Sequence, residues 1–151
     1  MSAVPTDADR AEIVDLVQRS QLRGIEFHEV SVRRLEVNKQ SEESTESVEI
    51  SLTVQHRRDS DSFGVLFSCT ALPYKGEISV AVAAEYDMTD GETPGERTVK
   101  AFANEVAVMT LFPYVREAVS TGSVRVFGKP VTLPVLERGQ VAFDLDEDAS
   151  E

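Results

Sequence analysis

Hydrophobic and polar residues alternate along four stretches of the chain, and this alternation predicts β-strands. The clearest stretch is residues 48–56, where polar residues occupy one face and the other carries Val48, Ile50, Leu52 and Val54. The other predicted strands are residues 25–38, 63–72 and 77–88. Because the links between the strands are short, neighbouring strands are expected to run antiparallel.

The first predicted strand is irregular. Ile25 and Phe27 point to one face, Val30 and Val32 point to the other, and Leu35 returns to the first. Each change of phase implies an extra residue, as in a β-bulge. Irregular strands are typical of sheet edges, so this strand is expected at an edge.

Residues 99–119 carry apolar residues at helical spacing on every side. From residue 106 to residue 115 only Thr110 is polar. A helix that is apolar all round is buried on all sides, and a stretch this short cannot cross a bilayer. One small sheet covers only one side of it, and each large apolar side chain left in water forfeits about 1.5–3 kcal/mol. The pattern therefore predicts an oligomer. The first apolar face of the helix consists of Val99, Phe102, Val106, Met109 and Pro113. The second consists of Ala103, Ala107, Leu111, Tyr114 and Val115, and the third of Ala101, Val108 and Phe112.

Pro113 lies inside this predicted helix. Because proline removes a backbone donor and pushes against the preceding turn, it kinks or divides a helix. The alternative is a helix that ends near Thr110 and restarts with Pro113 in its first turn. Thr121 and Gly122 are expected to end the helix, and the two prolines of residues 128–136 favour an extended segment after it.

A short helix is predicted over residues 10–22, capped by Asp7 or Asp9 and ended by Gly24. Its expected inward residues are Ile13, Leu16 and Val17.

The order of short helix, four strands and long helix predicts an α+β fold. In this fold a four-stranded antiparallel sheet carries the long helix on one face. Residues 1–143 are expected to form a single domain, followed by an acidic, disordered tail over residues 144–151. Residues 39–47, which are polar and low in complexity, are expected to form a mobile loop.

Acidic residues outnumber basic ones by 27 to 15, giving a formal charge of -12. This charge repels nucleic acid and anionic membranes, so neither is an expected partner. The N-terminus lacks the apolar core of a signal peptide, and no apolar run reaches membrane length. With one cysteine, Cys69, the chain forms no internal disulfide, and a cytoplasmic location is predicted.

No enzyme signature is present, so the chain is not expected to be an enzyme or to need a cofactor or metal. His28 and His56 are separate in sequence and are interpreted as structural, since a metal site would require them to meet in space. Cys69 lies among apolar neighbours in a predicted strand and is expected to be an inert core thiol.

Two segments together resemble the SecB family of export chaperones. They are Leu111-Phe112-Pro113-Tyr114-Val115-Arg116-Glu117 and Pro130-Val131-Thr132-Leu133-Pro134-Val135-Leu136, and the sheet-then-helix order before them also fits. The N-terminal helix leading into residues 20–25 looks more like the actinobacterial SecB-like branch. Some members of that branch serve toxin–antitoxin systems, in which the chaperone protects an aggregation-prone antitoxin.

The resemblance implies a homotetramer, a dimer of dimers, that binds non-native clients in apolar surface grooves without nucleotide. The client-binding residues that it suggests are Ile25, Phe27, Val30, Tyr74, Leu133, Val135 and Leu136, and the alternative for each is a place in the ordinary core. The family packs the long helix between subunits, which suggests an interface of Phe102, Val106, Met109, Phe112 and Tyr114. Export members end in a second helix that lines the groove and contact the SecA motor through residues that this chain does not match.

The resulting prediction is an ATP-independent holdase for unfolded or partly folded proteins, acting in protein transport or in antitoxin protection. One alternative is an adaptor for a single partner protein. Another is a hotdog-type enzyme for a small ligand, although there the helix normally precedes most of the strands.

Overall fold

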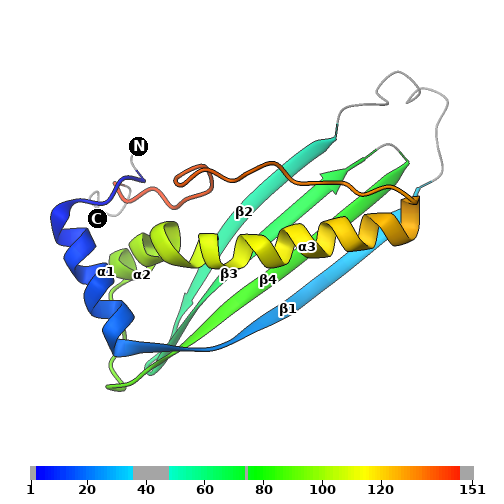
Figure 1. Cartoon of the computed structure of the whole chain (residues 1–151). Coiled ribbons are helices and arrows are strands. Elements are labelled where there is room, and N and C mark those ends of the chain that lie inside the picture. The colour runs from blue at the N-terminus through cyan, green and yellow to red at the C-terminus, as the bar shows by residue number, and fades with distance from the viewer. Residues whose placement is uncertain (1–2, 36–47, 74, 147–151) are drawn as a thin grey trace.

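The computed structural model describes residues 3–35, 48–73 and 75–146 (Figure 1). The elements are α1 (Asp7–Arg19), β1 (Ser20–Arg34), β2 (Glu49–Arg58), β3 (Ser62–Leu72), β4 (Gly76–Met88), α2 (Glu96–Phe102), the π-helical turn η2 (Ala103–Ala107) and α3 (Val108–Phe127). The strands form one sheet in the order β1-β4-β3-β2, and all neighbours are antiparallel. The predicted α+β fold is confirmed, while the predicted loop at 39–47 lies outside the described residues.

Strand β1 contains two bulges and lies at an edge of the sheet, as its irregular pattern predicts. Its register with β4 shifts between Leu22 and Gly24 and again between Phe27 and Glu29. The second bulge corrects one expectation. Val30 pairs with Val80 on the core face of β4, so it lies on the same face as Phe27 rather than on the opposite one, because the extra residue restores the alternation.

The long helix is continuous from Glu96 to Phe127, with η2 between its two α-helical parts. The structure therefore contradicts both a restart at Pro113, which lies inside α3, and an end at Thr121 and Gly122. The helix ends instead at Phe127, where Gly128 takes a left-handed conformation with φ of 77° and donates its N–H to the Val124 carbonyl.

The π-helical turn explains why one predicted helix face is divided in the structure. The Val108 N–H donates to the carbonyl of Ala103, five residues earlier, so the turn holds one residue more than an α-helical turn. The extra residue rotates everything after it by about 100° relative to regular α-helical spacing. Val99 and Phe102 are accordingly buried, whereas Met109 and Pro113, predicted on the same face, are exposed.

Two parts of the chain cover the core face of the sheet. The helix α2–α3 lies across the sheet, and the segment after it, residues 129–146, returns beside the helix in the opposite direction (Figure 1). We call residues 129–146 the C-terminal strap. The strap buries Leu133, Leu136 and Leu145 in the core cluster. The all-round apolar helix is thus covered on two sides by its own subunit, and Leu145 of the predicted tail is packed rather than exposed.

The N-terminal helix α1 is capped by Thr6 rather than by Asp7 or Asp9. The Thr6 hydroxyl accepts the N–H of Asp9, and the Asp9 carboxylate accepts the N–H of Thr6, which is a capping box. The helix ends at Arg19, so Gly24 lies in β1 and not at a helix end, and Val17 is exposed rather than inward.

Arg97 joins α1, α2 and the strap. Its guanidinium donates to both oxygens of Asp9, at 2.9 and 3.0 Å, and to the carbonyl of Leu145. The hydrogen bond to Arg97 is the largest cause that lowers the pKa of Asp9 to about 2. Since Asp9 is buried, this ion pair is expected to stabilise the fold when the carboxylate is charged.

We predict that Asp9→Asn lowers the free energy of unfolding by about 2 kcal/mol at pH 7, because the amide keeps the cap but loses the charge. The folded-state pKa is depressed, so this contribution is full above the unfolded value of 3.8 and is lost as the pH falls towards 2. Urea unfolding of both proteins across this range measures it. Asp7→Asn, at an exposed ion pair with Arg10, is the control and should change little. A constant difference between wild type and Asp9→Asn at all pH values would contradict the linkage.

Candidate functional site

The sheet has two edges, β1 and β2, that pair on one side only among the described residues. An open edge presents unpaired backbone N–H and C=O groups, to which another strand can add. Both edges carry incompletely buried apolar side chains on the face that also holds the helix. The two edges are therefore the candidate sites for binding another polypeptide.

The β1 edge is the more apolar of the two. Leu22, Phe27 and Val30 are 44%, 47% and 54% exposed, and Tyr114 of α3 is 43% exposed beside them. The rings of Phe27 and Tyr114 meet edge to face, with centroids 6.4 Å apart. We call these four residues the β1 strip.

The Phe27–Tyr114 contact separates two hollows along the strip. Leu22 borders one hollow together with Val17 and Val106. Val30 borders the other hollow, whose far wall includes Ala118 and Thr121 of α3. The strip is therefore a shallow, interrupted trough between an edge strand and a helix rather than a closed pocket.

The predicted client-binding residues are divided between the two edges. Phe27 and Val30 belong to the β1 strip, and Ile25 is half-buried near them. In the strap, Leu133 and Leu136 are buried within the subunit, whereas Val135 is 76% exposed. Tyr74 lies outside the described residues.

The predicted interface residues are also divided. Phe102 is buried within the subunit against the rings of Phe63 and Tyr86, and Phe112 is buried near Phe67. The others are accessible to different degrees: Val106 is half-buried, and Met109 and Tyr114 are exposed. In this subunit the accessible part of the predicted interface therefore lies on the outer side of the helix.

The β2 edge is partly covered by the strap. Ile50, Leu52 and Val54 of β2 are half-buried against the core, and the Phe143 ring of the strap meets the His56 ring edge to face at 5.2 Å. Val135 projects from the strap and is exposed. This edge thus offers an open strand beside a segment that is itself extended.

Side chains of the helix hold the strap in place. The Ser123 hydroxyl accepts the N–H of Val131, and the Asn104 amide both accepts the N–H and donates to the carbonyl of Phe143. Across the described ranges, no backbone-to-backbone hydrogen bond joins the strap to the sheet. The strap is therefore attached by buried side chains, by side-chain hydrogen bonds and by an ion pair of Arg138 with Glu105 at 3.4 Å.

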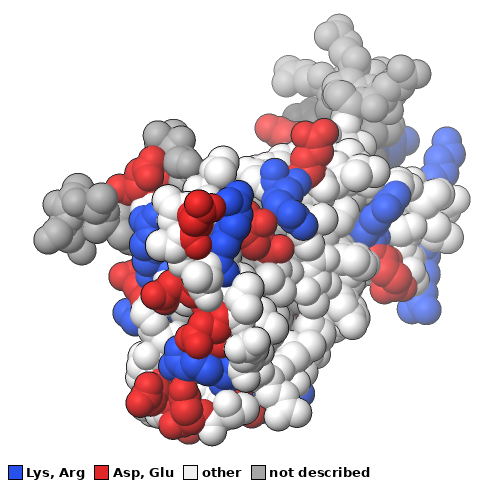
Figure 2. Space-filling view, turned by 60° about the vertical axis from the view of Figure 1, so that its left-hand side comes forward, with Lys and Arg blue, Asp and Glu red and all other residues white. Residues whose placement is uncertain are grey.

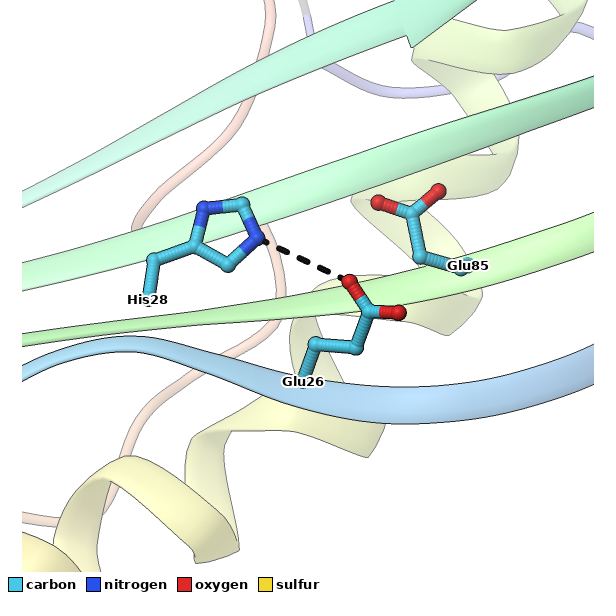
Figure 3. Close-up of side chains that lie close together, drawn as sticks. All are labelled: Glu26, His28 and Glu85. Atoms are coloured by element: carbon cyan, nitrogen blue, oxygen red, sulfur yellow. Dashed lines mark ion pairs between the residues drawn. The ribbon is translucent and has the colours of Figure 1, made fainter.

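One group of possible metal ligands is found among the residues that the structure describes. Glu26, His28 and Glu85 bring ligand atoms within 4.8 Å of one another (Figure 3), and His28 Nε2 lies 3.9 Å from a Glu26 oxygen. However, the buried Glu85 carboxylate pairs closely with Arg57 and lies 3.7 Å from Arg23. A cation would have to compete with two guanidinium groups, so we interpret the group as a structural charge cluster.

The sequence pattern gives no sign of this charge cluster, because Glu26 and His28 of β1 meet Glu85 of β4 only through the register of the two strands. The backbone of Gly64 makes room for it, since a Cβ at that position would lie 2.7 Å from a Glu85 oxygen. The expectation for Cys69 agrees with the structure: the side chain is buried, and burial raises the pKa of its thiol to about 11, which keeps it protonated at neutral pH.

Charged side chains of both signs are interspersed at the end of the molecule that carries α1 (Figure 2). Arg19 is an example, since it pairs with Asp15 and with Asp90. The net negative charge is therefore not focused into one acidic field at this end. None of the helices in the described part of the chain combines the length and apolarity needed to span a bilayer.

Comparison with known proteins finds similarity to a curated protein and to a solved structure. No family model matches the chain. The chain is 27% identical over 141 residues to the SecB-like chaperone SmegB of Mycolicibacterium smegmatis, covering 93% of this chain and 91% of that protein. It also matches the Mycobacterium tuberculosis SecB-like chaperone Rv1957, solved in complex with a ChAD peptide from the Rv1956 HigA1 antitoxin. That match has a TM-score of 0.65 and 23% identity, and it covers 86% of this chain and 99% of that one.

These similarities confirm the resemblance that the central helix and the proline-containing segment predict. The chain is similar to SecB-like chaperones of the actinobacterial branch, and its fold is SecB-like. The relatives are named as chaperones and not as enzymes.

We predict that Glu85→Gln lowers the free energy of unfolding by about 1–2 kcal/mol, because Arg57 and Arg23 lose their shared charge partner. Denaturant unfolding at pH 7 measures the change. Glu26→Gln, an exposed member of the same cluster, is the control and should cost much less. If added Zn²⁺ raised the melting temperature of the wild type but not of Glu85→Gln, the cluster would be a metal site instead.

Proposed function

We propose that the protein is an ATP-independent holdase chaperone that keeps aggregation-prone polypeptides soluble in the cytoplasm. Its relatives are named SecB-like chaperones, and the structural relative is bound to a peptide from an antitoxin. We therefore propose an antitoxin as one class of client and a polypeptide awaiting export as another. A dedicated adaptor for one partner is the second candidate, because a single antitoxin supplied the peptide bound to the relative.

The observation that carries this proposal is the presence of exposed apolar side chains beside each open strand edge. A non-native polypeptide exposes apolar side chains together with unpaired backbone groups. An open edge with an apolar border satisfies both at once, through burial and through strand addition. Neither interaction requires nucleotide or a particular client sequence.

We assign the β1 strip to a second copy of the chain. Strand β1 is 15 residues long, and a permanently open edge of this length beside four exposed apolar side chains is a liability for aggregation. A permanently bound partner would remove this liability by pairing with the open edge. In a twofold dimer each subunit offers the same strip, so β1 pairs antiparallel with its copy and Phe27 and Tyr114 are covered.

We assign the client to the β2 edge and the strap. There the apolar side chains of β2 are half-buried, and the most exposed large apolar residue of the strap is Val135. This surface is less apolar than the β1 strip, so it can remain exposed to solvent while no client is bound. The net charge of -12 is expected to favour basic clients and to discourage association between assemblies.

The proposed assembly extends to a dimer of dimers. The outer side of the long helix remains exposed in the subunit, including Met109 and Pro113. Packing this side against the helices of another dimer would cover it. The tetramer would leave all four β2 edges on the outside.

We predict that the wild type is oligomeric at micromolar concentration and that Val30→Asp shifts it to a lower mass, because a buried unpaired carboxylate opposes the pairing of two strips. Light scattering after gel filtration measures the mass. Ser31→Asp, the same change one residue on and on the other face of β1, is the control and should leave the mass unchanged. A wild-type monomer would exclude the assembly. An unchanged mass with weaker client binding in Val30→Asp would reassign the strip to clients.

We predict that the wild type in excess delays the aggregation of chemically unfolded malate dehydrogenase without ATP, as followed by light scattering. Val135→Asp should weaken this effect severalfold, since it places a charge on the apolar client surface. Val14→Asp, the same change at an exposed position of α1 outside both edges, is the matched control. The absence of any delay by the wild type would exclude the holdase. Protection of an antitoxin but of no other unfolded protein would favour the dedicated adaptor.

A further inference from the structure

The end of the strap is held in the way that a receptor holds an extended peptide. Asn104 donates to the Phe143 carbonyl at 2.9 Å and accepts the Phe143 N–H at 2.7 Å. These are the two bonds that a neighbouring β-strand would form, and they do not depend on the side chain at the bound position. The Asn104 side chain is therefore able to bind the backbone of any residue placed there.

The position of Asn104 supports this interpretation. It is 2% exposed and lies in the π-helical turn η2. Such turns are uncommon and are frequent at functional sites, because the extra residue redirects a side chain. A buried amide at this turn has no packing advantage over an apolar residue, so its role lies in the two bonds that it makes.

Two large apolar side chains at the end of the strap, those of Phe143 and Leu145, contact the rest of the fold. Leu145 is buried, and Phe143 packs against His56 of β2 and beneath Lys100, whose Nζ lies 6.0 Å from the ring centre. Phe143 is half-buried, as are Ala142 and Asp144 beside it, so Leu145 is the fully buried anchor of this segment. Arg97 adds a bond to the Leu145 carbonyl. The site thus takes two large apolar side chains two residues apart.

Release of this segment leaves the sheet intact. Residues 141–146 form no backbone hydrogen bond to any strand among the described residues. Their departure would break the hydrogen bonds that Asn104 and Arg97 make to Phe143 and Leu145, and it would uncover both side chains. None of the strand pairings and none of the strap anchors before residue 141 would be affected.

We propose that residues 141–146 are an internal occupant of part of the client groove and that a client segment displaces them. The client segment is extended and apolar at alternate residues, and Asn104 binds its backbone as it now binds Phe143. This inference rests on the proposed holdase function. It adds the chemistry of the client segment, and it identifies a segment of the chain itself that competes with the client for the groove. Because the groove is free for only a fraction of the time, the apparent affinity for clients is reduced by that fraction.

Hydrogen exchange of the full chain tests the displacement directly. The probe is reduced and carboxymethylated α-lactalbumin, which stays unfolded without denaturant. At saturating probe, the amides of residues 141–146 should exchange at least threefold faster, because Phe143 loses its bond to Asn104. Unchanged or slower exchange of this segment, with probe bound, would overturn the proposal.

Affinity measurements with the same probe separate an internal competitor from an ordinary structural segment. Phe143→Ser weakens the occupant and should tighten probe binding at least threefold. Adding Asn104→Leu to Phe143→Ser should reverse this gain, because Asn104 also binds the client backbone. Ala142→Ser is the matched control in the same segment and should have no effect.

The outcomes for the two proposals differ. If the wild type binds the probe and Phe143→Ser binds it equally or more weakly while circular dichroism shows a folded protein, the displacement is wrong and the holdase stands. If neither protein binds the probe, both proposals fall.

Discussion

The structure depends on the mismatch between the width of the sheet and the width of the helix. Four strands spaced by about 4.8 Å make a sheet about 19 Å wide, whereas a helix with its side chains is about 10 Å across. One helix therefore cannot cover the core face. The strap covers the β2 side, with Leu133, Leu136 and Leu145 as its anchors. On the β1 side, α3 reaches Phe27 through Tyr114 but leaves Phe27 and Val30 exposed. The two candidate binding surfaces are the two places where this cover is thin or absent.

Features with a strong local signal could be predicted from the sequence. The alternation at residues 48–56, the irregularity of β1 and the apolar helix each follow from neighbouring residues, and all three are found. The bulges of β1 lie at Arg23 and His28, however, and within the described residues of this strand no bulge follows Val32, although the pattern predicted one. The features that could not be predicted depend on contacts across the fold. The extra residue of η2 leaves no mark in the spacing of apolar residues, yet it moves Met109 and Pro113 away from the buried face of Phe102. Thr6 and Asp9 form a capping box, but several acidic residues nearby gave equally good candidate caps.

The sequence indicates which apolar residues form the candidate site better than it indicates where they lie in the fold. Phe27, Val30 and Val135 are accessible, as the likeness to SecB chaperones suggests, but they belong to two separate edges. Leu133 and Leu136 have the same apolar character and are buried, because accessibility depends on how the strap packs and not on residue type. The Asn104 contact with Phe143 spans 39 residues of sequence and joins a helix to an irregular segment. Nothing in the spacing of these two residues indicates that they meet.

The two bulges in β1 limit which strands can add to that edge. Arg23 and His28 are each an extra residue relative to β4, so the free side of β1 has an interrupted set of donors and acceptors. A regular strand, such as those stacked in amyloid, matches only short portions of this set. A second β1, running antiparallel about an axis between the bulges, carries the same interruptions in reverse order. In the proposed dimer, the bulges would therefore favour pairing of β1 with its own copy over the indiscriminate stacking that leads to fibrils.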